Sequence, residues 1–409
     1  MSVRAAREER SSALPAGRPT VAVGVTHPQT CLVLGPRLRR LRETGFRVVL
    51  IGSPGRLLRQ TAEQEQVEYY AIQISRGIAP WADLVSLIRL IRLLHRLKPN
   101  VTEFSTPKAG LLGTLAAALC AVPRRVYALR GLRLETTSGS TRRLLLWAER
   151  FTCACAHHVL CNSQSLRQRA LDLRIVSLHK IQLIGDGSSN GVDMERFAPG
   201  RDRHRKKLGW SDANPVIGFV GRLTRDKGVP ELLEAFDAIV SEEPGARLLL
   251  VGWFDASEDA LSAVHRNRIE GDPRIHCTGF VHDAAPYYRS MDVMVLPTWR
   301  EGFPNVVLEA QSSGVPVVTT LSTGSRDSVV PEITGLLISP GYPQAISEAV
   351  LRLLRNPMLR KRMGSAARSW VAEHYADRRV LGLTAQFYCD LVPTEMRLSQ
   401  PQVDLPLPL

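Results

Sequence analysis

Several features that mark whole classes of protein are missing from this chain of 409 residues. Its longest apolar run, 111–122, has 12 residues, whereas about 20 are needed to cross a bilayer. The first 18 residues carry charges with no apolar stretch behind them, so they do not form a secretory signal. The seven cysteines are scattered, with no spacing typical of a zinc site or a disulfide framework. We therefore expect a cytosolic, reduced protein with no transmembrane helix.

Aromatic residues are also scarce, at 6% of the chain, and they are not interleaved with the basic residues. This argues against a nucleic-acid binder, in spite of a net charge of +14. The positive charge is concentrated in one half of the chain. Residues 1–199 hold 29 Lys and Arg against 14 Asp and Glu, whereas residues 200–409 hold 24 against 25. An anionic membrane surface, an anionic substrate or simply a solvated Arg-rich surface would explain the excess.

Short β-branched runs alternate with amphipathic stretches along both halves, a pattern typical of βαβ units and parallel sheets. The predicted strands of the first half are Val21–Val25, Val48–Ile51, Tyr70–Ile74, Val101–Phe104, Arg125–Ala128 and His158–Cys161. Those of the second half are Val216–Val220, Arg247–Val251, Arg274–Cys277, Asp292–Leu296 and Val315–Thr319. We predict an α/β protein with two doubly wound, Rossmann-like domains facing across a cleft.

The domain boundaries follow from a polar stretch, 185–205, that interrupts the alternation. We predict Rossmann-like domains over 19–197 and 198–375, the second binding a nucleotide-linked ligand. A C-terminal helix over 376–395 is expected to return towards the first domain. The two ends, 1–18 and 396–409, are predicted to be disordered.

Ligands bind such sheets beyond the carboxyl ends of the strands, and three loops there carry chemistry. In the first, Gly221 allows a tight turn, and Arg222 and Lys227 are placed to bind a diphosphate. The loop 322–328 is rich in Gly and Ser and offers backbone donors for phosphate, a weak signal by itself. None of these spacings matches a Walker loop or a dinucleotide fingerprint.

The remaining loop is Glu301–Ala310, in which Pro304 is predicted to open a helix. Glu301 then lies in the loop and Glu309 inside the helix, an arrangement in which both carboxylates can border one pocket. A helix-capping glutamate and a surface glutamate are the alternative. Backbone amides at the helix start are placed to meet phosphate or hydroxyl oxygens. These amides belong to Gly302, Phe303 and Asn305.

The combination of Gly221-Arg222, Lys227-Gly228 and the E-x7-E pair Glu301 and Glu309 resembles family 4 glycosyltransferases of the GT-B type. The likeness extends over roughly 20–390, with 104–110, 129–133 and 187–193 similar to a bacterial branch that builds capsule, exopolysaccharide, O-antigen and lipid-linked N-glycan precursors. It implies that Arg222 and Lys227 hold the donor diphosphate, Glu309 the ribose, and Glu301 the transferred sugar. It also implies a retaining transfer of a hexosyl or N-acetylhexosaminyl group from a UDP-sugar to an undecaprenyl-diphosphate-linked saccharide.

Two departures from the family pattern concern the first half. The chain has Arg130 in a loop where many members carry a His, and its first loop, 26–31, lacks the family's Gly-Gly pair. We assign Arg130 to the acceptor side together with Thr26 and His27. No Asp-x-Asp metal clamp is present, so we expect no metal and no cofactor, with Arg222 and Lys227 neutralising the leaving diphosphate. A UDP-sugar epimerase of the same architecture is the alternative function.

Residues 81–98 form a basic amphipathic pattern suited to a membrane interface. Packing of this helix on the core, with its Arg and Lys in solvent, is the alternative. We expect the protein to attach peripherally to the inner face of the plasma membrane.

Overall fold

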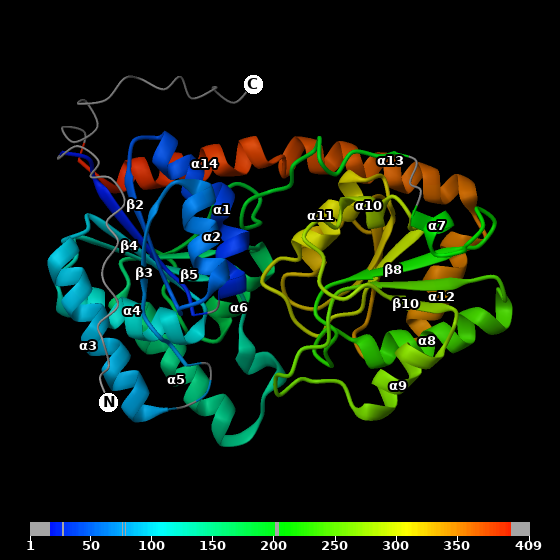
Figure 1. The fold of residues 1–409 in the computed structure, drawn as a ribbon, viewed down its shortest axis with the longest axis horizontal. Helices are drawn as coiled ribbons and strands as arrows, with labels where there is room; N and C mark the ends of the chain where they lie inside the picture. Colours follow the sequence, from blue (N-terminus) through cyan, green and yellow to red (C-terminus); the bar gives the residue numbers. More distant parts are fainter. Residues whose placement is uncertain (1–16, 27, 76, 78, 201–203, 394–409) are drawn as a thin grey trace. The chain divides into compact units, whose positions relative to one another are not determined.

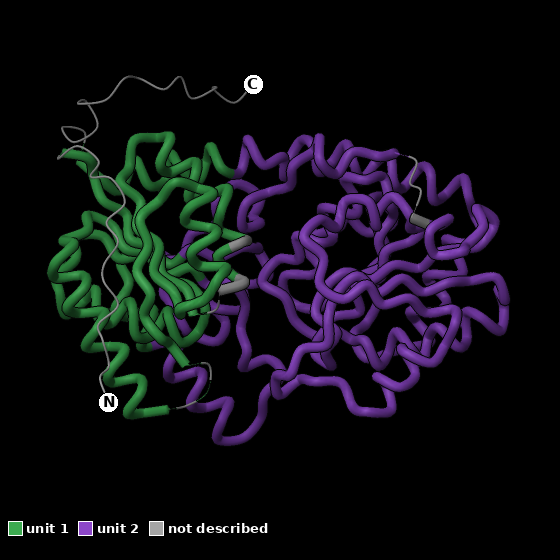
Figure 2. Tube along the Cα trace, viewed as in Figure 1, with its two compact units in different colours: residues 1–128, 151–159, 381–409 green, residues 129–150, 160–380 purple. Residues whose placement is uncertain are grey.

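The computed structural model describes residues 17–26, 28–75, 77, 79–200 and 204–393. The chain forms two compact units, drawn in different colours in Figure 2. Unit 1 comprises 1–128, 151–159 and 381–409, and unit 2 comprises 129–150 and 160–380. Among the residues that the structure describes, no helix is long and apolar enough to cross a bilayer.

The first sheet has seven strands in the order β3-β2-β1-β4-β5-β6-β7. Strands β1 to β5 pair in parallel, and every residue of the central strands β1 and β4 is buried. The strand bounds are β1 Thr20–Gly24, β2 Arg47–Gly52, β3 Glu68–Ala71, β4 Val101–Ser105, β5 Arg124–Leu129, β6 His158–Cys161 and β7 Ile181–Leu183. The order reverses at β1, so that helices α1 and α2 pack on one face and α3 and α4 on the other (Figure 1).

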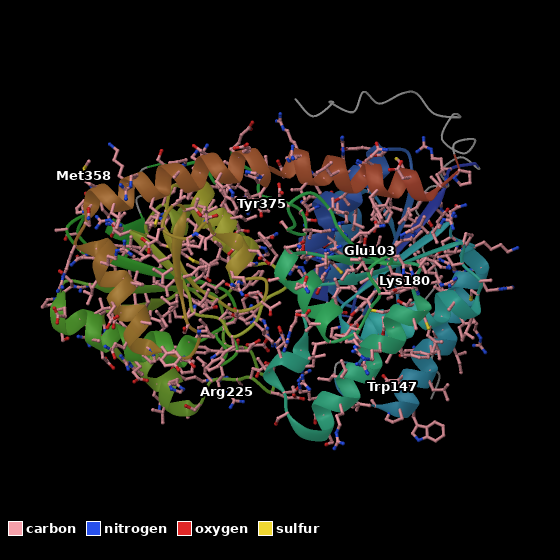
Figure 3. The ribbon with its side chains drawn as sticks, turned by 180° about the vertical axis from the view of Figure 1, so that it is seen from behind. Glu103, Trp147, Lys180, Arg225, Met358 and Tyr375 are labelled. Carbon is pink, nitrogen blue, oxygen red and sulfur yellow. The ribbon has the colours of Figure 1, made fainter. Side chains whose placement is uncertain are left out.

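The helices of this half alternate with its strands. They are α1 Pro28–Glu43, α2 Arg56–Glu65, α3 Pro80–Leu97, α4 Pro107–Leu119, α5 Gly139–Cys155 and α6 Gln164–Asp172. Unit 1 also holds a buried ion pair, in which Arg37 Nη1 lies 2.8 Å from each carboxylate oxygen of Glu103 on β4 (Figure 3). The hydroxyl of Tyr388, on α14 (Asp377–Leu391), donates to the same carboxylate. The C-terminal helix is thereby held in unit 1 by a polar contact inside the core.

The second sheet has six strands in the order β10-β9-β8-β11-β12-β13, all paired in parallel. Their bounds are β8 Val216–Val220, β9 Arg247–Val251, β10 Ile275–Cys277, β11 Val293–Leu296, β12 Val317–Thr320 and β13 Gly335–Ile338. The remaining helices are α7 His204–Lys207, α8 Val229–Glu242, α9 Ala263–Gly271, α10 Ala285–Tyr288, α11 Asn305–Ser312, α12 Pro343–Leu354 and α13 Pro357–His374. A continuous apolar core, with β8, β9 and β11 buried almost throughout, supports the loops at their carboxyl ends.

The doubly wound α/β architecture predicted from the sequence is confirmed, and each predicted strand lies within a few residues of an observed one. The short edge strands β7 and β13 were not predicted. Pro304 does not open the helix as predicted. It is the capping residue, and α11 begins at Asn305, because Pro304 has extended dihedral angles.

Candidate active site

Backbone packing and hydrogen bonds hold the loop after β8 against the loop after β11. Gly228, which precedes α8, has a φ of 73°, and a Cβ there would lie 2.0 Å from the carbonyl oxygen of Pro297. Only glycine fits such a conformation and approach. One residue further along, Thr298 Oγ1 donates to the carbonyl oxygen of Asp226 at 3.1 Å, and the Trp299 amide donates to the same oxygen at 2.9 Å. The segment carrying Arg222 and Lys227 is therefore fixed against the segment carrying Glu301.

Two aspartates hold Arg222 in place. Its Nη1 lies 2.7 Å from Asp255 Oδ2, and its Nη2 lies 3.8 Å from Asp226 Oδ2. Burial opposes the charge on Arg222, but the hydrogen bond that Arg222 donates to Asp255 and the charges of Asp226 and Glu301 outweigh it and raise the pKa of Arg222. One third of the Arg222 side chain stays exposed. The guanidinium is thus oriented by neighbours while part of it remains open to a ligand.

The Asp226 carboxylate contacts several polar groups of this site at once. Its carboxylate accepts a hydrogen bond from Thr224 at 2.6 Å and one from Arg300 Nη2 at 2.9 Å. Burial would raise the pKa of Asp226, yet the bond from Thr224 and the charges of Lys227, Arg300 and Arg222 lower it. Asp226 therefore stays ionised and balances the surrounding cations.

Lys227 and Glu301 form an ion pair through Nζ and Oε1. Both side chains are largely buried, with exposed fractions of 17% and 15%. The structure thus brings together Arg222, Lys227 and Glu301, which were predicted from two separate loops. A diphosphate bound by Lys227 would lie directly beside the Glu301 carboxylate.

Glu309 lies in the second turn of α11 and accepts a hydrogen bond of 2.7 Å from the Tyr288 hydroxyl. Glu309 keeps a narrow opening to solvent, but protein atoms surround its carboxyl group. Desolvation raises the pKa of Glu309 to about 7, although the bond from Tyr288 opposes this rise. The carboxyl therefore changes charge near neutral pH, and its free oxygen can accept a hydrogen bond from a ligand hydroxyl.

The amides between the two glutamates remain available. Within the described part of the chain, no hydrogen bond takes the backbone N–H of Gly302, Phe303 or Asn305. The Phe303 ring packs against Tyr375, with ring centres 5.2 Å apart, so Phe303 offers its backbone and not its side chain. Asn305 Oδ1 accepts a hydrogen bond of 2.9 Å from Ser188. The Asn305 amide begins α11 and those of Gly302 and Phe303 lie just before it, where the helix dipole favours an anion.

Arg130 lies in the same unit as these residues. Its Nη1 donates to Ser189 Oγ at 3.1 Å, and Asn162 donates to the same oxygen at 3.0 Å. The backbone around Arg130 is in tight contact with the Glu301 loop, since a Cβ on Gly302 would lie 2.2 Å from the Arg130 carbonyl oxygen. The assignment of Arg130 to the acceptor side stays a prediction.

The other two acceptor-side candidates belong to unit 1. Thr26 is buried, with its Oγ1 2.7 Å from Thr106 Oγ1, and it accepts a hydrogen bond of 3.0 Å from the Ala109 amide at the start of α4. Thr26 therefore supports the first turn of α4. His27 lies outside the described residues.

Sequence reasoning missed the residues that orient the predicted ones. They are Asp226, Asp255, Tyr288, Arg300, Ser188 and Ser189. Asp226 and Arg300 directly precede the predicted residues Lys227 and Glu301 in the sequence. That position was the one signal that could have indicated their roles. The others come from distant loops, so only the fold reveals their contacts.

Comparison with known proteins identifies the family. A model of the glycosyl transferases group 1 matches residues 214–356, and one of the glycosyl transferase 4-like domain matches residues 37–187. The capsular polysaccharide biosynthesis glycosyltransferase CapM of Staphylococcus aureus is 34% identical over 355 residues, which cover 87% of this chain and 92% of CapM. The chain belongs to the family 4 glycosyltransferases. It is an enzyme that transfers a hexosyl group.

Other family 4 relatives differ in their donors. A UDP-Gal:alpha-D-GlcNAc-diphosphoundecaprenol alpha-1,3-galactosyltransferase of Escherichia coli is 29% identical, over 71% of this chain and 76% of that protein. A GDP-mannose-dependent alpha-mannosyltransferase of Mycolicibacterium smegmatis is 31% identical, over 74% of each chain. The family therefore does not by itself decide between UDP and GDP.

Solved structures confirm the predicted GT-B fold. HepE of Anabaena, in complex with UDP, has a TM-score of 0.74 at 18% identity and covers 91% of this chain and 100% of its own. Sucrose-phosphate synthase of Thermosynechococcus elongatus has a TM-score of 0.75 at 21% identity, over 91% of this chain and 99% of its own. At these identities the likeness shows the fold alone.

Proposed function

We propose that this glycosyltransferase moves a hexosyl or N-acetylhexosaminyl group from a UDP-sugar to an undecaprenyl-diphosphate-linked saccharide, with retention, in capsule or other cell-surface polysaccharide biosynthesis. The observation that carries the proposal is the clustering of Arg222, Lys227 and Glu301 next to the unoccupied amides that begin α11. The similarity to CapM and to the E. coli galactosyltransferase supports the pathway and the lipid-linked acceptor. The E. coli relative, named as a UDP-Gal enzyme, supports a UDP-linked donor.

Charge neutralisation needs no metal in this proposal. The guanidinium of Arg222 and the ammonium of Lys227 face the negative charge that develops on the leaving diphosphate, and the amides before α11 add dipoles of the same sign. Because Asp255 and Asp226 already orient Arg222, little reorganisation accompanies the reaction. The ionised Glu309 accepts hydrogen bonds from the ribose hydroxyls.

Glu301 is the proposed catalytic carboxylate. When Lys227 pairs with the bound diphosphate, its ion pair with Glu301 breaks. The Glu301 carboxylate then faces the transferred sugar. There it either attacks the anomeric carbon and expels UDP, forming a glycosyl ester that the acceptor hydroxyl then displaces, or it stabilises the positive charge during front-face attack. In the second route the acceptor hydroxyl attacks from the face that UDP leaves, with the leaving phosphate acting as the base. Both routes give retention, as expected for an α-linked product from an α-linked donor.

The experiment is a transfer reaction with UDP-glucose, UDP-galactose or UDP-N-acetylglucosamine and an undecaprenyl-diphosphate-linked sugar, in the presence of EDTA. We expect a glycolipid product whose new linkage has the anomeric configuration of the donor. A parallel reaction contains GDP-mannose, and transfer from GDP-mannose alone would contradict a UDP-linked donor. Inhibition by EDTA would contradict metal independence. The epimerase alternative predicts conversion of the UDP-sugar without any acceptor.

Attachment to an anionic membrane is proposed through α3 of unit 1. Its exposed stripe begins with Trp81, Val85 and Ile88, which have exposed fractions of 83%, 47% and 39%, and continues with exposed Arg residues. The one acidic residue of the helix, Asp83, is paired 2.8 Å from Lys108. The stripe thus combines apolar insertion with positive charge, as interfacial helices do.

Flotation with anionic vesicles tests this attachment. We expect the wild type to float at low salt and the Val85→Glu/Ile88→Glu variant to remain at the bottom. Val264→Glu is the matched control, because Val264 is also exposed, at 75%, but lies on α9 of unit 2. Equal flotation of all three proteins, or none of the wild type, would refute the proposal.

A further inference from the structure

A polar cavity of about 370 Å³ lies in unit 2 between α6 and the segment 321–327. Leu321 is the one apolar residue among those that line it, and the stems of the longer polar side chains add apolar surface. The cavity is lined from α6 by Gln164, Gln168 and Arg169, and from the other side by Thr323 and Arg326. This volume falls within the usual range for small-molecule sites and would hold one sugar ring.

The acidic residues of the cavity are already engaged with neighbours. Asp327 accepts a hydrogen bond of 2.8 Å from the Ser165 amide, and Asp172 accepts one of 2.8 Å from Gln168 Nε2. Arg169 is shared with Glu135, whose Oε1 lies 3.2 Å from its Nε. Arg326 is exposed, and no hydrogen bond or ion pair of its guanidinium occurs among the described residues. Arg326 is therefore the lining cation whose guanidinium can pair with a ligand, and the amide groups of Gln164 and Gln168 lie on the facing helix.

One wall of this cavity, the segment 321–327, packs against the loop that carries Glu301. The Thr323 carbonyl accepts a hydrogen bond of 3.1 Å from the Glu301 amide. A Cβ on Gly324 would lie 2.4 Å from the carbonyl oxygen of Gly302 and 2.6 Å from that of Glu301, so the two loops are in direct backbone contact. A ligand in the cavity would thus lie one loop away from the proposed reacting centre.

We propose that this cavity is a subsite for the acceptor saccharide, in which Arg326 binds an anionic group of that saccharide. The inference rests on the proposed transfer to a saccharide acceptor and deepens it. The planar guanidinium of Arg326 pairs with an oxyanion, and the amides of Gln164 and Gln168 bond to ring hydroxyls. The anion is either the phosphate that links the acceptor to its carrier or the carboxylate of a uronic acid.

Ligand-observed NMR titrations test the subsite, with saturating UDP present to occupy the donor site. The probes are N-acetylglucosamine 1-phosphate, methyl glucuronide and the neutral methyl N-acetylglucosaminide. We expect one of the anionic probes to bind more tightly than the neutral one, and Arg326→Ala to weaken that probe roughly five- to tenfold. Preference for the phosphate assigns the anion to the carrier linkage, whereas preference for the glucuronide assigns it to a uronic acid.

Arg362→Ala is the matched control, because it removes an exposed guanidinium of α13 away from the cavity. Arg326→Lys keeps the charge but not the bidentate geometry, and it should bind the anionic probe with intermediate affinity. Equal affinities in the wild type and Arg326→Ala, or no binding of either anionic probe, would overturn the subsite. If that result is accompanied by normal UDP binding and sugar transfer, the proposed function stands. If the wild type neither binds UDP nor transfers a sugar, the proposed function itself is contradicted.

Discussion

Replacing Glu301 with Gln should tighten UDP binding while it abolishes sugar transfer. In the unliganded enzyme Lys227 is paired with Glu301, and both side chains are largely buried. Binding of a diphosphate has to break that pair and place negative charge next to a carboxylate. Both costs disappear in Glu301→Gln, whereas the carboxylate needed for catalysis is lost.

The size of this effect follows from Coulomb's law. Two like charges about 6 Å apart repel by roughly 3 kcal/mol at an effective dielectric constant of about 20. Because one sixth of each side chain remains exposed, screening reduces this to about 1–2 kcal/mol. UDP should therefore bind roughly five- to thirtyfold more tightly to Glu301→Gln.

Isothermal titration with UDP near neutral pH measures this change, and a transfer assay on the same samples measures catalysis. Glu332→Gln is the control, because Glu332 forms a surface pair with Arg352, in which both side chains are more than half exposed. That variant should bind UDP as the wild type does. Equal or weaker UDP binding by a folded Glu301→Gln protein would refute the competition, and near-normal transfer would refute the catalytic role.

Three further predictions concern the surroundings of this site. The pKa of Glu309 is raised to about 7, and the ionised carboxylate accepts hydrogen bonds from the ribose hydroxyls, so UDP affinity should rise from pH 6 to pH 8. The terminal phosphate of UDP itself loses a proton at about pH 6, so Glu309→Gln should keep a smaller rise. Titrations at each pH should show a several-fold larger rise in the wild type, in which Glu309 also changes charge. Tyr288→Phe removes the hydrogen bond that lowers this pKa, so the midpoint of the same curve should move to higher pH; an unmoved midpoint contradicts the assignment. Gly302→Ala should lose about 1–3 kcal/mol of unfolding free energy, because its Cβ would meet the Arg130 backbone. Gly382→Ala, in open space on α14, should instead stabilise the fold by up to about 1 kcal/mol in the same denaturant titration.

Protonation of Glu309 also links stability to pH. A carboxyl whose pKa is higher in the folded protein than in the unfolded chain stabilises the fold when protonated. That contribution is complete below the ordinary value of 4.5 and is lost as the pH rises through about 7. Glu309→Gln should therefore show a flatter dependence of stability on pH over this window.

The sequence predicted those parts of the site that depend on local order. Each strand-to-loop transition was recognisable from a β-branched run followed by glycine or proline, and this placed Arg222, Lys227 and Glu301 at the same edge of a sheet. The position of Glu309 inside α11 followed from the helical pattern after Pro304. The start of α11 was wrong by one residue, because proline fits both the first turn and the cap, and sequence alone does not distinguish these positions.

The contacts that tune the site depend on long-range packing and could not be predicted. Asp255 reaches Arg222 from the loop after β9, and Tyr288 reaches Glu309 from α10. Neither residue has a sequence signature, since an aspartate in a loop and a tyrosine in a short helix are common everywhere. The Lys227–Glu301 pair was missed for a related reason. The two residues were assigned separate ligand contacts, and their contact with each other appears only in the folded chain.

The central claim is that Arg222 and Lys227 hold the diphosphate of a uridine nucleotide. Thermal unfolding with UDP and with GDP, in the wild type and in Arg222→Ala/Lys227→Ala, tests it most directly. UDP at about 100 times its dissociation constant should stabilise the wild type by roughly 2.7 kcal/mol, and the double variant should lose this gain. Stabilisation by GDP alone would contradict the donor assignment, and an undiminished UDP effect in the folded double variant would contradict the claim itself.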